Sequence, residues 1–206
     1  LAESVVTEDG NMYKADMFCA GIGIMLNTGF LEGSGIETGR GIIVDEYLET
    51  NVEGVYAAGD VAEFEDLILG YRHLTGHIEN AFQQGRTAGR NMAGAKTAYA
   101  QVTGYDTEIF GTPLIFIGAP DIGEEFCTRR DNDKPRVCFS FRGGRLAGAL
   151  LIKPDGKDIR VIKELVGMGE DGPYGFKEEL CDPDTDLGTF LEHIKGKEGH
   201  WRKDDR

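Results

Sequence analysis

The sequence has little of several features that mark whole classes of proteins. Its four cysteines include no Cys-x-x-Cys pair and have no metal-ligand spacing, so we expect reduced thiols, as in a cytoplasmic protein, rather than a disulphide framework. Cys19 stands in an apolar run and is expected to be buried. No apolar stretch approaches the length of a membrane span, and no signal-peptide pattern is present. The cysteines are Cys19, Cys127, Cys138 and Cys181.

Basic residues are also scarce. The 22 lysines and arginines face 36 aspartates and glutamates, which gives a net charge of −14 and a pI near 4.7. Both a nucleic-acid backbone and an anionic membrane would repel such a chain, so we expect neither as a partner. A small acidic partner would need a local basic patch. Hydrophobic residues make up 40% of the 206 residues, enough for one large or two small globular domains.

A complete Gly-x-Gly-x-x-Gly nucleotide loop is missing as well. The stretch Gly21-Ile-Gly-Ile-Met-Leu26 starts correctly, but Leu26 stands where the third glycine must allow close helix packing, and residues 33–38 fail in the same way. We expect no metal site either. His73 and His77 are four residues apart, but Thr75-Gly76 between them marks a helix start and no third ligand has suitable spacing.

The most informative stretch runs from Thr50 to Glu63. It predicts a short buried strand at Val55–Ala58 that stops at Gly59-Asp60. Asp60 would then lie at the carboxyl end of a strand, where open α/β sheets bind ligands, and Gly59 would let a ligand approach the main chain. An ordinary Gly-Asp turn after a strand explains the same residues.

The rest of the N-terminal half predicts a hairpin, a further strand, a loop and a helix. The hairpin spans residues 4–20 and ends in a buried strand at residues 17–20, and the next strand is at residues 42–44. Residues 63–72 are expected to form a packed connecting loop or a surface strap. The helix spans residues 76–93, and its apolar and small residues should face a sheet or a cofactor.

The C-terminal half predicts a small α+β domain. After a linker or short helix at residues 96–105, a strand is expected at residues 114–118, and Gly143-Gly144 marks a hairpin. A helix at residues 159–168 should pack on that sheet. A second, amphipathic helix is expected at residues 186–195, followed by a frayed, charged end that contains Trp201.

Three segments in order resemble one known family. Thr-x-x-x-x-Val-Tyr-Ala-Ala-Gly-Asp-Val-Ala at residues 50–62 resembles the second flavin signature of the FAD-dependent pyridine nucleotide-disulphide oxidoreductases. Residues 39–45 resemble the Gly-x-Ile-x-Val-Asp segment of that family, and residues 80–86 its Asn-Ala-x-x-Gln-Gly helix. The sequence is most similar to the branch of NADH oxidase, coenzyme A-disulphide reductase, rubredoxin reductase and nitrite reductase flavoprotein.

The resemblance implies an α/β fold made of the C-terminal part of an FAD-binding Rossmann-like domain, at residues 1–95, followed by a small α+β interface domain at residues 96–169. Residues 170–206 would be an acidic or polar extension. In relatives the interface domain makes a homodimer, so a homodimer through residues 96–169 is expected here.

The resemblance also implies a cofactor site. Asp60 would hydrogen-bond the ribityl chain of FAD, and Gly59 would allow the approach of the cofactor. His77 and Ile78, at a helix start, would lie nearest the isoalloxazine ring, where the partial positive charge of the helix N-terminus would stabilise a reduced flavin. The sequence names no catalytic acid, base or nucleophile.

The function implied is transfer of electrons from NAD(P)H through FAD to a disulphide, oxygen or a small electron carrier. The chain begins at Leu1 without a methionine and has no nucleotide loop, so we expect a C-terminal fragment that is inactive by itself. Two alternatives remain open at this point. One is a cofactor-free fragment for dimerisation or assembly, and the other is a small stand-alone α/β ligand-binding protein.

Overall fold

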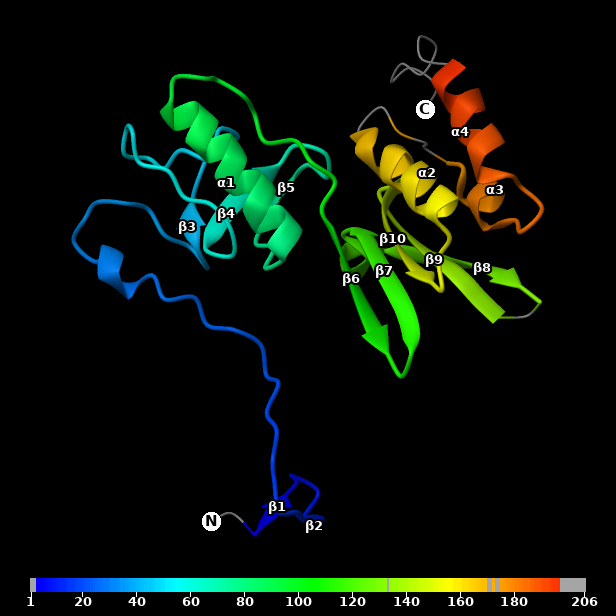
Figure 1. Cartoon of the computed structure of the whole chain (residues 1–206), viewed down its shortest axis with the longest axis horizontal. Coiled ribbons are helices and arrows are strands. Elements are labelled where there is room, and N and C mark those ends of the chain that lie inside the picture. The colour runs from blue at the N-terminus through cyan, green and yellow to red at the C-terminus, as the bar shows by residue number, and fades with distance from the viewer. Residues whose placement is uncertain (1–2, 133, 170–171, 173–174, 197–206) are drawn as a thin grey trace.

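Two bodies and an extended arm make up the chain (Figure 1). The computed structural model describes residues 3–132, 134–169, 172 and 175–196. The frayed end expected after Lys195, with Trp201, lies almost wholly outside these residues. No helix in the described ranges is both long and apolar enough to cross a membrane.

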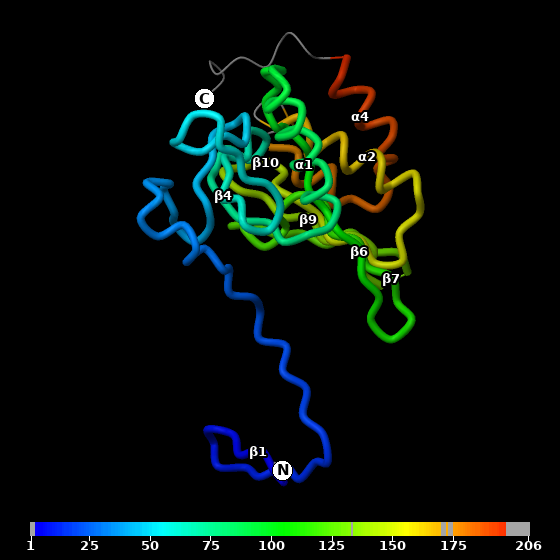
Figure 2. Tube along the Cα trace, turned by 60° about the vertical axis from the view of Figure 1, so that its left-hand side comes forward, coloured from blue at the N-terminus to red at the C-terminus, as the bar shows by residue number. Residues whose placement is uncertain are grey.

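The arm begins with a hairpin. Strands β1 (Ser4–Val6) and β2 (Met12–Lys14) pair antiparallel, with Val5 opposite Tyr13, which confirms the predicted hairpin. The predicted buried strand at residues 17–20 is wrong, because the described chain has no strand there and both Met17 and Cys19 are exposed. Figure 2 shows the reason: this part of the arm runs away from both bodies, so Met17 and Cys19 lie outside their cores.

The first body combines a three-stranded sheet with one long helix. The sheet order is β3-β4-β5, with β3 parallel to β4 and β4 antiparallel to β5. The predicted strand at residues 42–44 is confirmed as β3. The elements are the 3-10 turn η1 (Gly29–Leu31), β3 (Ile42–Ile43), β4 (Ala62–Asp66), β5 (Tyr71–His73) and helix α1 (Ile78–Met92).

The strand predicted at residues 55–58 is wrong. Its main chain makes a single bridge, between Tyr56 and Glu49, and the nitrogen of Ala57 donates to the carbonyl of Leu48 at 3.1 Å. The apolar run at residues 55–58 is too short to form a regular strand, and it pairs with residues 48–50 in an irregular hairpin. The regular strand is β4, which starts two residues after Asp60, so Asp60 precedes the amino end of a strand instead of following a carboxyl end.

The loop predicted at residues 63–72 is also wrong. It contains most of β4 and β5. In β4 the half-buried Glu63 and Glu65 alternate with buried residues, among them Phe64, which is 1% exposed, and Asp66. The carboxylate of Asp66 shapes the turn by accepting from the nitrogens of Ile68 and Leu69, both at 2.9 Å. The alternation of buried and half-buried side chains, more than the charge of the segment, therefore indicates that it forms strands.

Helix α1 confirms the predicted helix, and Gly94, with φ +95, follows its end. Of the two predicted neighbours of its apolar and small residues, the sheet is wrong, whereas the cofactor stays a prediction. Ile78 is 91% exposed and Phe82 60% exposed, whereas the side of the helix turned toward the sheet is mostly polar. The buried residues are Asn80, Gln84, Ala88 and Asn91.

These amides are buried because they bond the main chain around them. Asn91 donates to the carbonyls of Tyr47 and Thr97 at 2.8 and 2.9 Å, and Asn80 donates to the carbonyl of Thr75 at 3.0 Å. Such bonds offset the cost of removing an amide from water, so hydrophobic periodicity misses the buried side. The apolar part of this core contains Ile42, Val44, Leu48, Ala57, Ala62, Phe64, Ala88 and Tyr99.

The second body is a five-stranded antiparallel sheet covered by helices. The strand order is β6-β7-β10-β9-β8. The predicted strand at residues 114–118 and the hairpin at Gly143-Gly144, where both glycines have positive φ, are confirmed. The strands are β6 (Gly104–Ile109), β7 (Thr112–Gly118), β8 (Glu125–Asp131), β9 (Lys134–Arg142) and β10 (Arg145–Ile152), and the 3-10 turn η2 spans Pro120–Ile122.

Sequence reasoning missed the two edge strands, β6 and β8. Both are rich in polar residues and largely exposed, because an edge strand has one neighbour and little contact with the core. The predicted helices are confirmed as α2 (Gly156–Gly167) and α4 (Leu187–Gly196), and a short helix α3 (Lys177–Cys181) lies between them. Side chains from all three helices join the sheet in one core, among them Ile162, Leu180 and Leu191.

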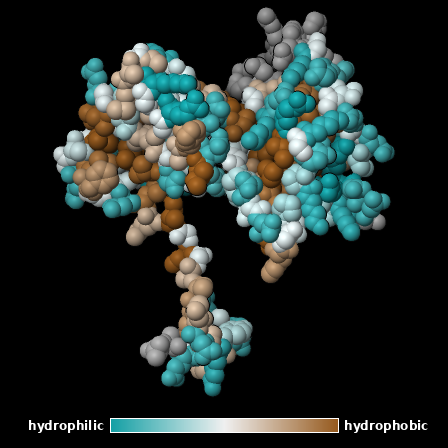
Figure 3. Space-filling model, in the orientation of Figure 1, coloured by the Kyte–Doolittle hydropathy of each residue, from teal (hydrophilic) through white to brown (hydrophobic). Residues whose placement is uncertain are grey.

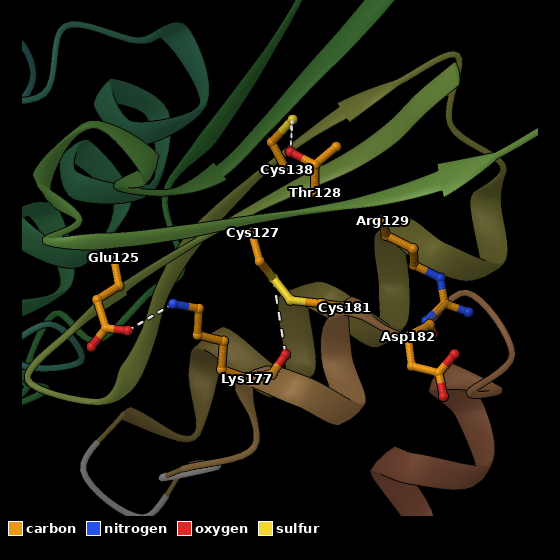
Figure 4. Close-up of a disulfide and its surroundings, with 8 residues drawn as sticks. All are labelled: Glu125, Cys127, Thr128, Arg129, Cys138, Lys177, Cys181 and Asp182. Atoms are coloured by element: carbon orange, nitrogen blue, oxygen red, sulfur yellow. Dashed lines mark hydrogen bonds and ion pairs between the residues drawn. A yellow bond between two sulfur atoms is a disulfide. The ribbon is translucent and has the colours of Figure 1, made fainter. Parts of the chain in front are cut away.

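Cys127 of β8 and Cys181 of α3 form a disulphide across a sequence separation of 54 (Figure 4). The expectation that all cysteines are reduced is therefore wrong for this pair. Spacing along the sequence could not reveal it, because the fold of the sheet and α3 brings the two residues together. Arg129 adds to the connection by donating to the carbonyls of Asp182 and Pro183 at 2.8 and 3.0 Å.

The α/β fold class is thus confirmed. The domain boundaries at residues 95 and 169 stay a prediction.

Candidate functional site

The loop at Gly59 and Asp60 meets the start of helix α1. A side-chain carbon placed on Gly76 would lie 3.5 Å from Oδ2 of Asp60, and one placed on Gly59 would lie 3.3 Å from Cβ of Ala81. Gly59 has φ +83, a left-handed conformation in which other residues are strained. Gly59 thus lets the main chain of the loop lie close to Ala81 of the helix, and Asp60 is exposed at this junction.

Gln84 fixes this loop from inside the body. Its side chain is fully buried, and Oε1 accepts a hydrogen bond of 2.7 Å from the nitrogen of Gly59. Its Nε2 has no hydrogen-bond partner in the described structure. Sequence reasoning gave Gln84 no role. The signal available was its place one helical turn after Asn80 and one turn before Ala88, on the buried stripe of α1.

His77 occupies the N-cap position of α1 in an extended conformation, with φ −131 and ψ 140. Its side chain makes no capping hydrogen bond to the described helix, and its ring instead stacks on Tyr105 with 4.0 Å between the ring centroids. Desolvation lowers the pKa of His77, and the carboxylate of Asp60 opposes this shift. His77 is therefore mainly neutral at pH 7, and the positive potential at this end of α1 comes from the main chain.

The four predicted site residues thus lie around one junction. Gly59 and Asp60 come from the loop before β4, and His77 and Ile78 come from the start of α1. The first N–H groups of a helix have no partner within that helix, so they are donors for an anionic or electron-rich group. Asp60 supplies acceptors beside them. The junction can bind a group that carries both hydroxyls and acceptors, and the role of these residues toward FAD stays a prediction.

His73 takes part in a separate, structural cluster. Its Nε2 lies 3.2 Å from Oδ2 of the buried Asp66, and its Nδ1 lies 3.3 Å from the hydroxyl of Tyr71. Burial, with the charge of Asp66, raises the pKa of Tyr71 to about 12, so this hydroxyl stays protonated. Among the described residues no group of three or more His, Cys, Asp or Glu could hold a metal ion.

Comparison with known proteins identifies the family. Residues 1–85 match the sequence model described as pyridine nucleotide-disulphide oxidoreductase. The ferredoxin--NAD(+) reductase component of the anthranilate 1,2-dioxygenase system of Burkholderia cepacia is 30% identical over 193 residues. Residues 1–85 of the chain belong to the pyridine nucleotide-disulphide oxidoreductase family.

Other relatives agree. The pyridine nucleotide-disulfide oxidoreductase domain-containing protein 1 of Drosophila melanogaster is 29% identical over 206 residues, with 90% of this chain and 42% of the relative covered. The NADH-rubredoxin oxidoreductase of Clostridium acetobutylicum is 30% identical over 132 residues, with 64% and 31% covered. The match in Burkholderia cepacia covers 91% and 46%. The chain therefore spans less than half the length of these curated relatives.

Solved structures show the same fold. The ferredoxin reductase for the CYP199A2 system of Rhodopseudomonas palustris superposes with a TM-score of 0.80 at 23% identity, over 92% of this chain and 46% of that one. The structure of Fdr9 gives a TM-score of 0.70 at 25% identity, over 87% and 47%. Both bodies of the chain thus keep an arrangement found in these two structures.

The junction fits the flavin part of FAD, the cofactor that the family implies. A side chain on Gly76 would lie against the carboxylate of Asp60 and against Cδ1 of Ile24 from the arm, at 3.5 and 3.8 Å, so the glycine keeps this side of Asp60 clear. The carboxylate is an acceptor for hydroxyl groups. Bound FAD would supply hydride and electron transfer. The chain has no Gly-x-Gly-x-x-Gly loop for the ADP half, so its residues account for only part of such a site.

Proposed function

We propose that this chain forms the flavin side of an oxidoreductase that passes electrons from NAD(P)H through FAD to an acceptor. The observation that carries the proposal is the exposed carboxylate of Asp60, set between Gly59 and Gly76 at the N-terminus of α1. Membership of the oxidoreductase family supports it, as do relatives named as reductases of ferredoxin or rubredoxin.

Each residue at the junction has a part in this function. Asp60 accepts hydrogen bonds from the ribityl hydroxyls, and Gly59 keeps the loop clear of the cofactor. The N-terminus of α1 stabilises the negative charge of reduced flavin. The neutral ring of His77 adds no positive charge of its own to that of the helix N-terminus. Ile78, being almost fully exposed, presents an apolar surface beside the ring.

A small acidic electron carrier is the acceptor that the surface favours. The outer side of α1 presents Phe82 with Arg86 and Arg90 at intervals of four residues, and the guanidinium of Arg86 lies 5.7 Å from the centre of the Phe82 ring. This stripe is a local basic and apolar patch on a chain with a net charge of −14. Charge attraction of this kind steers a carrier to its reductase. A homodimer through residues 96–169 and a cytoplasmic location are also part of the proposal, although the Cys127–Cys181 disulphide removes the argument for that location from reduced thiols.

The test is FAD binding by the purified chain. After incubation with FAD and gel filtration, flavin absorbance near 450 nm (about where free flavins absorb) should travel with the protein. Asp60→Ala should weaken binding about tenfold, the equivalent of one lost charge-assisted hydrogen bond. Asp184→Ala, which removes an exposed carboxylate between α3 and α4, should leave binding unchanged.

Two results would count against the proposal. If Asp60→Ala bound FAD as tightly as the wild type, the carboxylate would have no role in the site. If the wild-type protein eluted colourless, the cofactor-free alternative, an assembly fragment, would be the better account of this chain.

A further inference from the structure

Three aromatic rings form a continuous stack between the two bodies. The ring of Tyr105, from β6, lies between that of His77, before α1, and that of Phe116, from β7. The centroids of Tyr105 and Phe116 are 4.4 Å apart with 5° between the planes, and those of His77 and Tyr105 are 4.0 Å apart with 27°. Helix α1 lies against β6 at this point (Figure 1).

The sheet fixes one end of the stack. Tyr105 and Phe116 are directly opposite each other in the antiparallel register of β6 and β7, so their rings stand on one face of the sheet. Phe116 is partly buried, and β7 is paired on its other side with β10. The position of the Tyr105 ring is thus set by the second body, independently of α1.

The other end of the stack reaches the cofactor junction. His77 precedes α1 and follows Gly76, which borders the carboxylate of Asp60. The side chain of His77 does not cap the helix, and its ring is held instead by the stacking contact with Tyr105. The first turn of α1 is therefore tied to the sheet of the second body through a residue 28 positions away in the sequence.

We infer that Tyr105 is a positioning residue of the flavin site: its ring holds His77, and with it the N-terminus of α1, in register with Asp60. The inference rests on the proposed function and adds to it that the second body forms part of the site. Desolvation raises the pKa of Tyr105 and lowers that of His77, so two neutral rings stack at pH 7. Stacked aromatic pairs of this geometry stabilise the contact beyond burial alone.

The test compares three variants of the full chain. Tyr105→Ala removes the middle ring, Tyr105→Phe keeps the ring without the hydroxyl, and Tyr13→Ala removes an exposed tyrosine of the arm as the control. FAD affinity is measured by fluorescence titration, and the ring protons of His77 are followed by NMR. Thermal unfolding of each variant shows whether it is folded.

We expect Tyr105→Ala to weaken FAD binding about two- to tenfold, the range that corresponds to the loss of one aromatic pair. The His77 ring protons should move downfield, because they lose the shielding of the stacked ring. Tyr105→Phe should restore both properties to within about twofold of the wild type, since the ring makes the contact. Tyr13→Ala should change neither.

Three results would overturn the inference. Unchanged FAD affinity in folded Tyr105→Ala, with shifted His77 signals, would show that the stack exists but does not serve the site. Unchanged His77 signals would show that the rings do not stack in solution. If the wild-type chain bound no FAD, the proposed function would fail, and the role of Tyr105 in that site with it, while the NMR signals would still report the stack.

Discussion

The two bodies of this chain are held together by different means. The second body has a continuous apolar core between its sheet and helices α2, α3 and α4, and a disulphide joins β8 to α3. The first body has a smaller apolar core, and one side of its only long helix is buried through asparagine and glutamine side chains. One body thus relies on packing, and the other relies on hydrogen bonds to its loops.

The bodies also differ in what they leave outside. Ile22 and Met25 of the arm and Ile78 of the first body are more than 90% exposed, and Figure 3 shows hydrophobic surface along both parts. Among the described residues of the second body, Phe110 at the turn between β6 and β7 alone is exposed to that extent. Exposed apolar surface of this extent is typical of a region that binds another group. The difference teaches that the second body buries its apolar residues in its own core, whereas the first body and the arm leave apolar surface beside the proposed cofactor junction.

The largest effect should come from the disulphide. Cys127→Ser should lower the free energy of unfolding of the second body by about 2–4 kcal/mol, because a crosslink closing about 54 residues restricts the unfolded chain. Chemical denaturation followed by circular dichroism measures this. Cys19→Ser, in the exposed arm, is the control and should have no effect. Equal stability of wild type and Cys127→Ser under oxidising conditions would show that the crosslink does not hold this body.

A smaller effect is expected from the polar core of the first body. Asn91→Ala should cost about 1–3 kcal/mol, because it leaves main-chain groups of Tyr47 and Thr97 without their partner. Hydrogen exchange of the amides in residues 44–50 and 96–99 should speed up, while that of the second body should not. Gln83→Ala, which loses only a bond to the exposed Glu79, is the matched control. If exchange accelerated equally in both bodies, they would unfold as one unit. The two bodies would then not be stabilised separately, one by apolar packing and the other by hydrogen bonds to its loops.

The smallest effect is the pH dependence at the junction. The folded pKa of His77 is lowered, so below the ordinary value of about 6.5 the unfolded chain binds more protons than the folded one. The contribution of His77 to stability is therefore complete above about pH 6.5 and falls as the pH drops below it. The unfolding midpoint of the wild type should fall more between pH 7.5 and 5.5 than that of His77→Phe. Identical pH profiles of the two proteins would show that His77 is not desolvated.

Much of the second body could be predicted from the sequence, because its signals are local. Gly143-Gly144 between two apolar runs encodes a hairpin, and the periodic apolar residues of α2 and α4 encode the faces that they bury. The first body was harder to predict. The face of α1 follows its amides instead of its apolar residues, and the strand expected at residues 55–58 became part of an irregular hairpin.

The sequence by itself determined the family, the position of helix α1 and the residues Gly59, Asp60, His77 and Ile78 as a candidate set, since motifs and helical periodicity are written in consecutive residues. Only the tertiary structure decided that Gln84 binds the Gly59 loop, that Tyr105 stacks on His77 and that Cys127 meets Cys181. These contacts join residues 25, 28 and 54 positions apart. Such pairs depend on how whole elements pack, and no local pattern in the chain specifies that packing.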